Sequence, residues 1–220
     1  MAVHESLGGA EGLYPNVEQI AGQTFNVTFG PGQVSQAEQG ALPPTWRFSS
    51  KDGAWTVSLA PEFVALETTR YTTWADDFRT RLRAIVDAVA EHVRPVLNSR
   101  IGVRYIDRIA EIGLATPADW EPYVSAELLG AARHPVLGPG VRQAQQQLLV
   151  EIDEDIACAL RHGFVPEGER VDYLMDFDVF RQAGRPFDAD EVKRTADTLN
   201  NYSLRLFHAC VTPALLEALR

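Results

Sequence analysis

Apolar and polar side chains alternate along several short runs in the first third of the chain, as they do in half-buried β-strands. The clearest of these runs follow one another closely, at 46–49, 55–59 and 63–69. Asp52-Gly53 separates the first two and favours a tight hairpin turn. A further strand is expected at 25–29, and the segment 30–44, rich in glycine, glutamine and proline, is expected to be a loop. The pattern predicts an antiparallel meander with one apolar face.

A long helix is predicted directly after this meander. Thr73 can cap its first turn, and Asp76 stands three residues later, as in a capping box. Apolar residues then recur at three- and four-residue spacing, at Trp74, Phe78, Leu82, Ile85, Val89 and Val93. Pro95 ends the pattern. The apolar stripe needs a partner, and the meander can supply it.

The second half repeats this order of patterns. A long strand is expected at 99–113, and short helices and a loop are expected between 116 and 140. Three more strands are then expected, at 145–152, 156–160 and 171–179. Asp188 can cap a second long helix, whose apolar stripe runs from Val192 to Cys210.

The order of elements predicts an α+β fold. We expect a largely antiparallel sheet built from two pseudo-repeated three-strand meanders, each followed by a long amphipathic helix packed on one face. Residues 1–22 are weakly patterned and are expected to form a flexible N-terminal arm. Residues 23–220 are expected to form a single domain, with pseudo-halves at about 23–113 and 141–220.

Charge and composition narrow the choice of partners. The 220 residues include 20 Lys and Arg and 30 Asp and Glu, so the formal net charge is -10. Nucleic acid is disfavoured as a partner, because coating it requires a basic surface. The sequence shows neither an apolar run of about 18 residues nor the pattern of a secretory signal, so no membrane is expected to be involved. Cys158 and Cys210 are expected to be buried thiols in a reducing cytoplasm.

Five charged residues on two predicted strands form the candidate ligand-binding site: Arg100, Arg104, Arg108, Asp176 and Asp178. The arginines share one face of their strand and could bind a phosphate or carboxylate group. The two carboxylates share a face of theirs and could hold a divalent cation or share a proton. The sequence favours another interpretation, in which the arginines pair with these carboxylates and with Asp172 across neighbouring strands. Such a ladder would set strand register more than it would add stability.

The sequence gives little support for a metal site, a catalytic site or a cofactor site. The five histidines never occur at a metal-ligand spacing, so no metal site is predicted. The chain has no Gly-x-Ser-x-Gly elbow and no Walker loop. We identify no catalytic residue and predict no cofactor.

Three motifs stand out beside these patterns: WRFSSKDGAWTVSLAPEFVALETTRYTTW at 46–74, Arg-Tyr-Ile-Asp at 104–107 and Tyr-Leu-Met-Asp-Phe-Asp at 173–178. They resemble a sporadically distributed family of uncharacterised bacterial proteins, over roughly residues 44–215. Asp107 departs from the family, which more often has Asn there. The family has no established activity. The resemblance implies one fold and a bacterial origin, and its patchy distribution implies mobile or defence-associated genes.

Three hypotheses for function follow. The first is a non-enzymatic binding or interaction protein, accessory to a bacterial defence or conflict system, whose acidic surface suits another protein; self-association belongs to the same class. The second is a small-ligand-binding or enzymatic domain with a pocket between sheet and helices. The third and weakest is a nucleic-acid-processing subunit that uses the arginine strip. A solid core with an exposed apolar patch would favour the first.

Overall fold

The computed structural model describes residues 1–25, 29–30, 33–34, 39–110 and 112–219, with side chains described outside 21–43. The chain is mixed helix and strand, and its paired strands are antiparallel. It divides into two compact units, Met1–Pro95 and Val96–Arg220. The predicted boundary between halves differs from this division, because the strand expected at 99–113 pairs within the sheet of the second unit.

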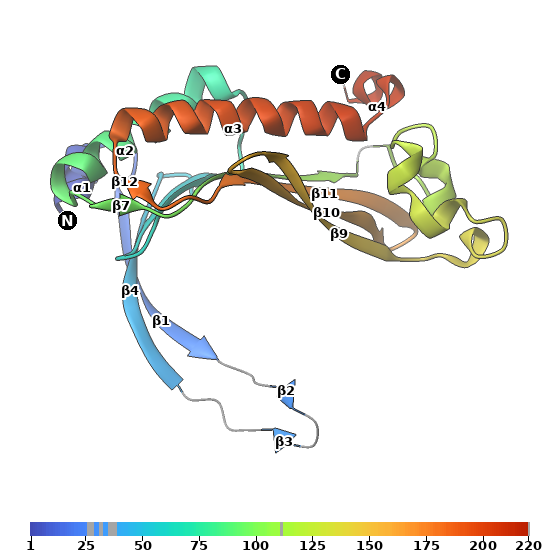
Figure 1. Ribbon diagram of the computed structural model, residues 1–220, viewed down its shortest axis with the longest axis horizontal. Helices are drawn as coiled ribbons and strands as arrows, with labels where there is room; N and C mark the ends of the chain where they lie inside the picture. The colour runs from blue at the N-terminus through green and yellow to red at the C-terminus, as the bar shows by residue number, and fades with distance from the viewer. Residues whose placement is uncertain (26–28, 31–32, 35–38, 111, 220) are drawn as a thin grey trace. The chain divides into compact units, whose positions relative to one another are not determined.

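The first unit contains a four-stranded sheet in the order β1-β4-β5-β6 (Figure 1). Its strands are β1 (Asn16–Phe25), β4 (Gln39–Ser49), β5 (Trp55–Leu59) and β6 (Val64–Thr68), with the short pair β2 (Phe29–Gly30) and β3 (Gln33–Val34) between the first two. Its helical elements are α1 (Ala2–Ser6), η1 (Gly9–Glu11), η2 (Trp74–Phe78) and α2 (Arg79–His92). The predicted meander over 46–69 is confirmed, and Gly53 supplies the positive φ of its first turn.

Helix α2 packs against one face of this sheet. Ile85 and Val89 are buried together with Phe48, Trp55 and Val57 of the strands. The predicted cap is present, since the Thr73 side chain accepts a hydrogen bond from the Asp76 amide. The first turn after this cap is wound as a π-helix, and the helix then continues as α2.

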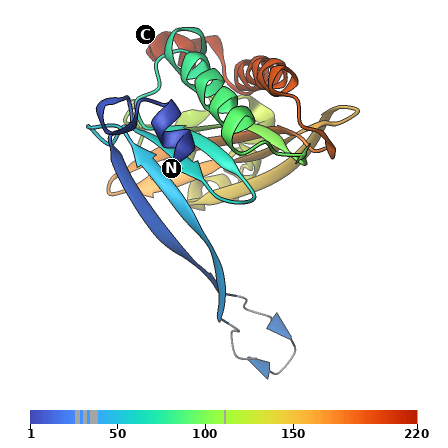
Figure 2. The ribbon, with the colours of Figure 1, turned by 90° about the vertical axis from the view of Figure 1, so that its left-hand side faces the viewer.

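The N-terminal residues, expected to form a flexible arm over 1–22, form α1, η1 and the beginning of β1. His4 is buried, with its ring stacked on Phe48 at 4.9 Å between centroids. Its Nε2 lies 2.8 Å from the carbonyl oxygen of Tyr14, which is also buried. Figure 2 shows α1 beside α2. These contacts join residues distant in sequence, so local patterning carries no trace of them.

The expected loop over 30–44 was also wrong in part, because β4 begins at Gln39. Strand β4 pairs with β1 over its whole length but with β5 only from Trp46 to Ser49. The register between β1 and β4 shifts between Ile20 and Gly22. Prolines 43 and 44 fall at this irregularity, where a missing amide hydrogen costs little. The strand expected at 25–29 lies partly outside the described residues.

The second unit contains a four-stranded sheet in the order β8-β11-β10-β9. Its strands are β8 (Ile101–Ile109), β9 (Ala144–Asp153), β10 (Ile156–Glu167) and β11 (Arg170–Arg181), beside a small pair formed by β7 (Leu97–Asn98) and β12 (Arg185–Pro186). Helices α3 (Ala189–Cys210) and α4 (Pro213–Ala218) end the chain. The strands predicted at 145–152, 156–160 and 171–179 are confirmed as the β9-β10-β11 meander.

Helix α3 lies over β8 and β11 (Figure 1). Asp188 caps it as predicted, accepting a hydrogen bond from the Glu191 amide. Between helix and strands, Met175, Phe177 and Leu199 are buried almost completely. The Tyr105 hydroxyl donates a hydrogen bond to Asn200 Oδ1 at 2.7 Å, so these two polar side chains satisfy each other where helix and strands pack together.

Short helical turns fill the region expected between 116 and 140. They are η3 (Pro117–Trp120), η4 (Ala126–Leu128), η5 (Gly130–Arg133) and η6 (Gly138–Gly140). Trp120 is buried, lies 5.4 Å from the Tyr173 ring and donates from Nε1 to the carbonyl oxygen of Val171. A bridge between Val124 and Val211 ties this region to the end of α3.

Candidate binding surface of the second unit

The arginines and carboxylates that the sequence singled out lie on the sheet face opposite α3. Strand parity puts them there, because Tyr105 and Phe177 contact the helix and their neighbours in sequence point away from it. Each arginine forms an ion pair at 2.7–2.8 Å, in the pairs Arg100–Asp178, Arg104–Asp176 and Arg108–Asp172. The predicted pairing of the arginines with the carboxylates is confirmed, and β8 and β11 are neighbouring strands. We call this set of six residues the ladder.

Asp176 is the most heavily bonded carboxylate of the ladder. Arg104 donates to both of its oxygens at 2.7 Å, and Arg161 of β10 donates at 3.2 Å. Asp176 is only 5% exposed. Burial alone would raise the pKa of Asp176, but the two guanidinium groups outweigh it and hold that pKa below its usual value. The charge of Asp176 is therefore balanced within the sheet, and little of it remains for a ligand.

The outer strand β9, in contrast to the ladder, has exposed side chains without ion-pair partners in the described part of the chain. Its residues 145–151 are all exposed, including three consecutive apolar side chains, Leu148, Leu149 and Val150. Leu149 is 71% exposed, and its two neighbours are 39% and 37% exposed. Among the described residues, β9 pairs only with β10, so its other edge presents unpaired amide and carbonyl groups. We call residues 145–151 the open edge.

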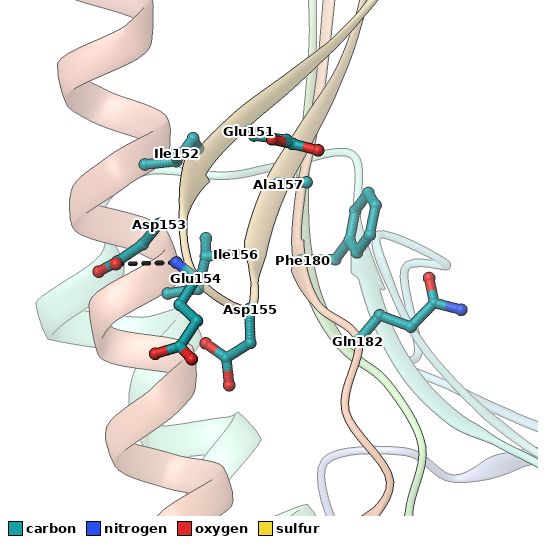
Figure 3. Close-up of a pocket in the computed structure, with 9 residues that line it drawn as sticks. All are labelled: Glu151, Ile152, Asp153, Glu154, Asp155, Ile156, Ala157, Phe180 and Gln182. Carbon is teal, nitrogen blue, oxygen red and sulfur yellow. Dashed lines mark hydrogen bonds between the residues drawn. The ribbon is translucent and has the colours of Figure 1, made fainter.

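A shallow pocket of about 540 Å³ lies at the end of this strand (Figure 3). Its lining combines four carboxylates with apolar groups and one amide: Glu151, Asp153, Glu154, Asp155, Ile152, Ile156, Ala157, Phe180 and Gln182. Asp155 is paired with Arg185 at 2.8 Å, whereas no ion pair joins the other three carboxylates to any described residue. The open edge therefore ends in a region of uncompensated negative charge.

Burial keeps the remaining reactive groups of this unit neutral. It raises the pKa of the Cys158 thiol to about 12 and that of Cys210 to about 11, so both are protonated near neutral pH. The His162 ring nitrogen Nδ1 lies 2.8 Å from the Tyr173 hydroxyl, and burial lowers the pKa of His162. Among the described atoms, Nε2 of His162 has no hydrogen-bond partner.

The described residues form neither a metal site nor a membrane-spanning helix. No three His, Cys, Asp or Glu side chains among them gather closely enough to hold a metal ion. No helix that they form is both long and apolar enough to cross a membrane.

The sequence predicted the ion pairs of the ladder but did not predict the open edge. Residues 145–152 were expected to form a strand, and three adjacent apolar residues between glutamines and acids were the available signal. A run of this kind is ambiguous, because it is also typical of a strand buried on both faces.

Comparison with protein-family models, with curated proteins and with solved structures found no match to this chain.

Proposed function

We propose that this protein is a non-enzymatic binding protein, and that it binds another polypeptide strand along the open edge of its second unit. The observation that carries the proposal is the combination in β9 of an unpaired strand edge with three adjacent exposed apolar side chains. An added strand would satisfy the backbone groups of that edge and cover the apolar side chains at the same time.

The ladder is less suited to bind a ligand. Each of its arginines already has a carboxylate partner within 2.8 Å, so an anionic ligand would have to displace an existing ion pair. The proposal therefore assigns Arg100, Arg104, Arg108, Asp176 and Asp178 to strand register. The ladder then holds the sheet in the geometry that presents the open edge.

Charge restricts the partners that fit. The open edge contains one acidic residue, Glu151, and no basic residue, and three further carboxylates follow it. A partner strand with acidic residues opposite Glu151 would be repelled, whereas a neutral or basic strand would not. The surface therefore suits a polypeptide and disfavours nucleic acid.

The alternative, a small-ligand-binding or enzymatic domain, has one observation in its favour. This is the buried and unpartnered Nε2 of His162. The side chains between the sheet and α3 weigh against it, because Met175, Phe177 and Leu199 occupy that space.

Two expectations stay predictions: the pseudo-repeat of the two halves and the accessory role in bacterial defence, which rests on the resemblance alone.

Site-specific photo-crosslinking in the intact cell tests the proposal. A photoreactive residue replaces Gln147 in the open edge, and the matched control replaces Thr198, an exposed residue of α3. A crosslinked product of discrete mass is expected from position 147 only, and Leu149→Lys in the same chain should abolish it. Equal products at both positions, or none at 147, would reject the proposed function.

A further inference from the structure

We propose that the strand bound by the open edge is β9 of a second copy of this chain. The two copies would pair antiparallel about a two-fold axis midway between the two Leu149 residues, which would join two four-stranded sheets into one of eight strands. This inference rests on the proposed function, because it names the partner of the same surface.

The backbone of the open edge is regular enough to accept a strand. Pairing between β9 and β10 runs without interruption from Ala144 to Glu151. The register then shifts at Ile152, before the turn that ends the strand. No proline and no basic residue occurs between Ala144 and Asp153, so the features that usually block strand addition at an edge are missing from this described segment.

Symmetry restricts the register. Directly opposite residues of an antiparallel pair point to the same face of the sheet. A two-fold axis normal to the sheet must therefore lie midway between one residue of β9 and the same residue of the second copy, and we name the axis by that residue. With the axis at Leu149, apolar residues pair with apolar residues and polar with polar. Leu149 faces its own copy, Leu148 faces Val150, and Gln147 faces Glu151.

Other registers pair these side chains less well. Moving the axis to Leu148 would set Gln147 against Leu149, and moving it to Val150 would set Leu149 against Glu151. Only the axis at Leu149 pairs apolar with apolar at each central position and gives each Glu151 an amide as its neighbour. This self-complementarity is the reason to choose a second copy over an unrelated strand.

The mass of the purified chain in solution tests the inference. Sedimentation equilibrium over increasing concentration should show a mass that rises from 24.3 kDa toward twice that value. Leu149→Lys places two like charges opposite each other and should raise the dimer dissociation constant by about tenfold or more. Ile106→Lys is the matched control, because Ile106 is 60% exposed on the outer strand β8. A wild-type chain that stays at 24.3 kDa throughout, or an equal loss of the dimer in both variants, would overturn the inference.

Disulfide trapping tests the register and does not depend on destabilising the dimer. Leu149→Cys sets two thiols directly opposite each other, about 4.5–5.5 Å apart at Cα, within reach of a disulfide. Leu148→Cys sets them two positions apart along the strands, about 7–8 Å diagonally, which exceeds that reach. Oxidation should therefore yield a covalent dimer from the first variant and not from the second. The wild-type chain gives the background from Cys158 and Cys210. Equal trapping at both positions would refute the register.

The dependence of association on salt concentration distinguishes this inference from the broader proposal. Two copies of a chain with net charge -10 repel each other, so added salt should tighten the dimer, whereas it should weaken a complex with a basic partner. If crosslinking from position 147 yields a product with a different polypeptide while the wild-type chain remains monomeric, the second copy is excluded and the proposed function stands. If no product forms, both fail.

Discussion

The two outer strands of the second unit's sheet, β8 and β9, are protected to very different degrees. Strand β8 carries Arg104 and Arg108, which reach across to carboxylates of β11, and α3 lies over it. Strand β9 has no basic residue, and its residues 145–151 are exposed. Both strands belong to one sheet and pair on one side only among the described residues. The contrast therefore lies in their side chains, not in their backbone environment.

Basic side chains at a sheet edge discourage a further strand, because that strand would have to accommodate or desolvate them. On β8 the arginines are also engaged in the ladder, so adding a strand there would disturb existing ion pairs. On β9 an added strand would disturb none of the ion pairs found between described residues, and it would cover Leu149. One edge is thus closed by charge, and the other is available for association.

Breaking the ladder should have the largest effect on stability. Arg104→Ala leaves Asp176 nearly buried with Arg161 as its remaining guanidinium partner. Loss of one partner from a buried ion pair costs about 3–5 kcal/mol, and the half-exposed Arg104 and the remaining contact should reduce this to about 2 kcal/mol. Hydrogen exchange of the β11 amides should reveal the loss. Replacing both partners, with Arg104→Met and Asp176→Leu, should restore most of it. An unchanged exchange rate in Arg104→Ala would show that the ladder does not stabilise the sheet.

Acid should weaken the same region by a smaller amount. The pKa of Asp176 is lowered in the folded chain, so in acid the unfolded chain binds a proton at this carboxyl before the folded chain does. Stability from this group is therefore full above its ordinary pKa of 3.8 and is lost as the pH falls through the lowered value. Thermal unfolding measured between neutral and acid pH should show a steeper loss for the wild-type chain than for Asp176→Asn. Parallel curves would mean that the Arg104 and Arg161 contacts do not govern the ionisation.

Parity along the strands was enough to predict the ladder, because residues two apart point to one face and opposite charges on adjacent strands attract. The docking of His4 on Phe48 could not be predicted, since α1 has five residues and its position depends on contacts with distant strands. The open edge was missed for a different reason. The order of the meander places β9 at one side of its hairpins, but periodicity does not tell whether another strand covers it.

Substitutions that add a charge at Gln147 of the open edge should change the dimer dissociation constant without changing the fold. Gln147 faces Glu151 of the second copy in the proposed register, and this contact occurs twice about the axis. Gln147→Lys should lower the dimer dissociation constant about severalfold by adding two cross-strand ion pairs, and Gln147→Glu should raise it by a similar factor. Sedimentation at low and high salt measures both, and the difference between the variants should shrink as salt screens the charges. A shift in the same direction for both variants would exclude this register.

The smallest effect is expected from a charge added to the edge that is already charged. Ile106 lies between Arg104 and Arg108 on β8 and is 60% exposed, so Ile106→Lys buries no new charge. The free energy of unfolding should change by less than about 0.5 kcal/mol, as for most surface substitutions. The mass in solution should also stay that of the wild-type chain, in contrast to Leu149→Lys. If Ile106→Lys instead dissociated the dimer, β8 would be the associating edge, and the exposed apolar run of β9 would need another explanation.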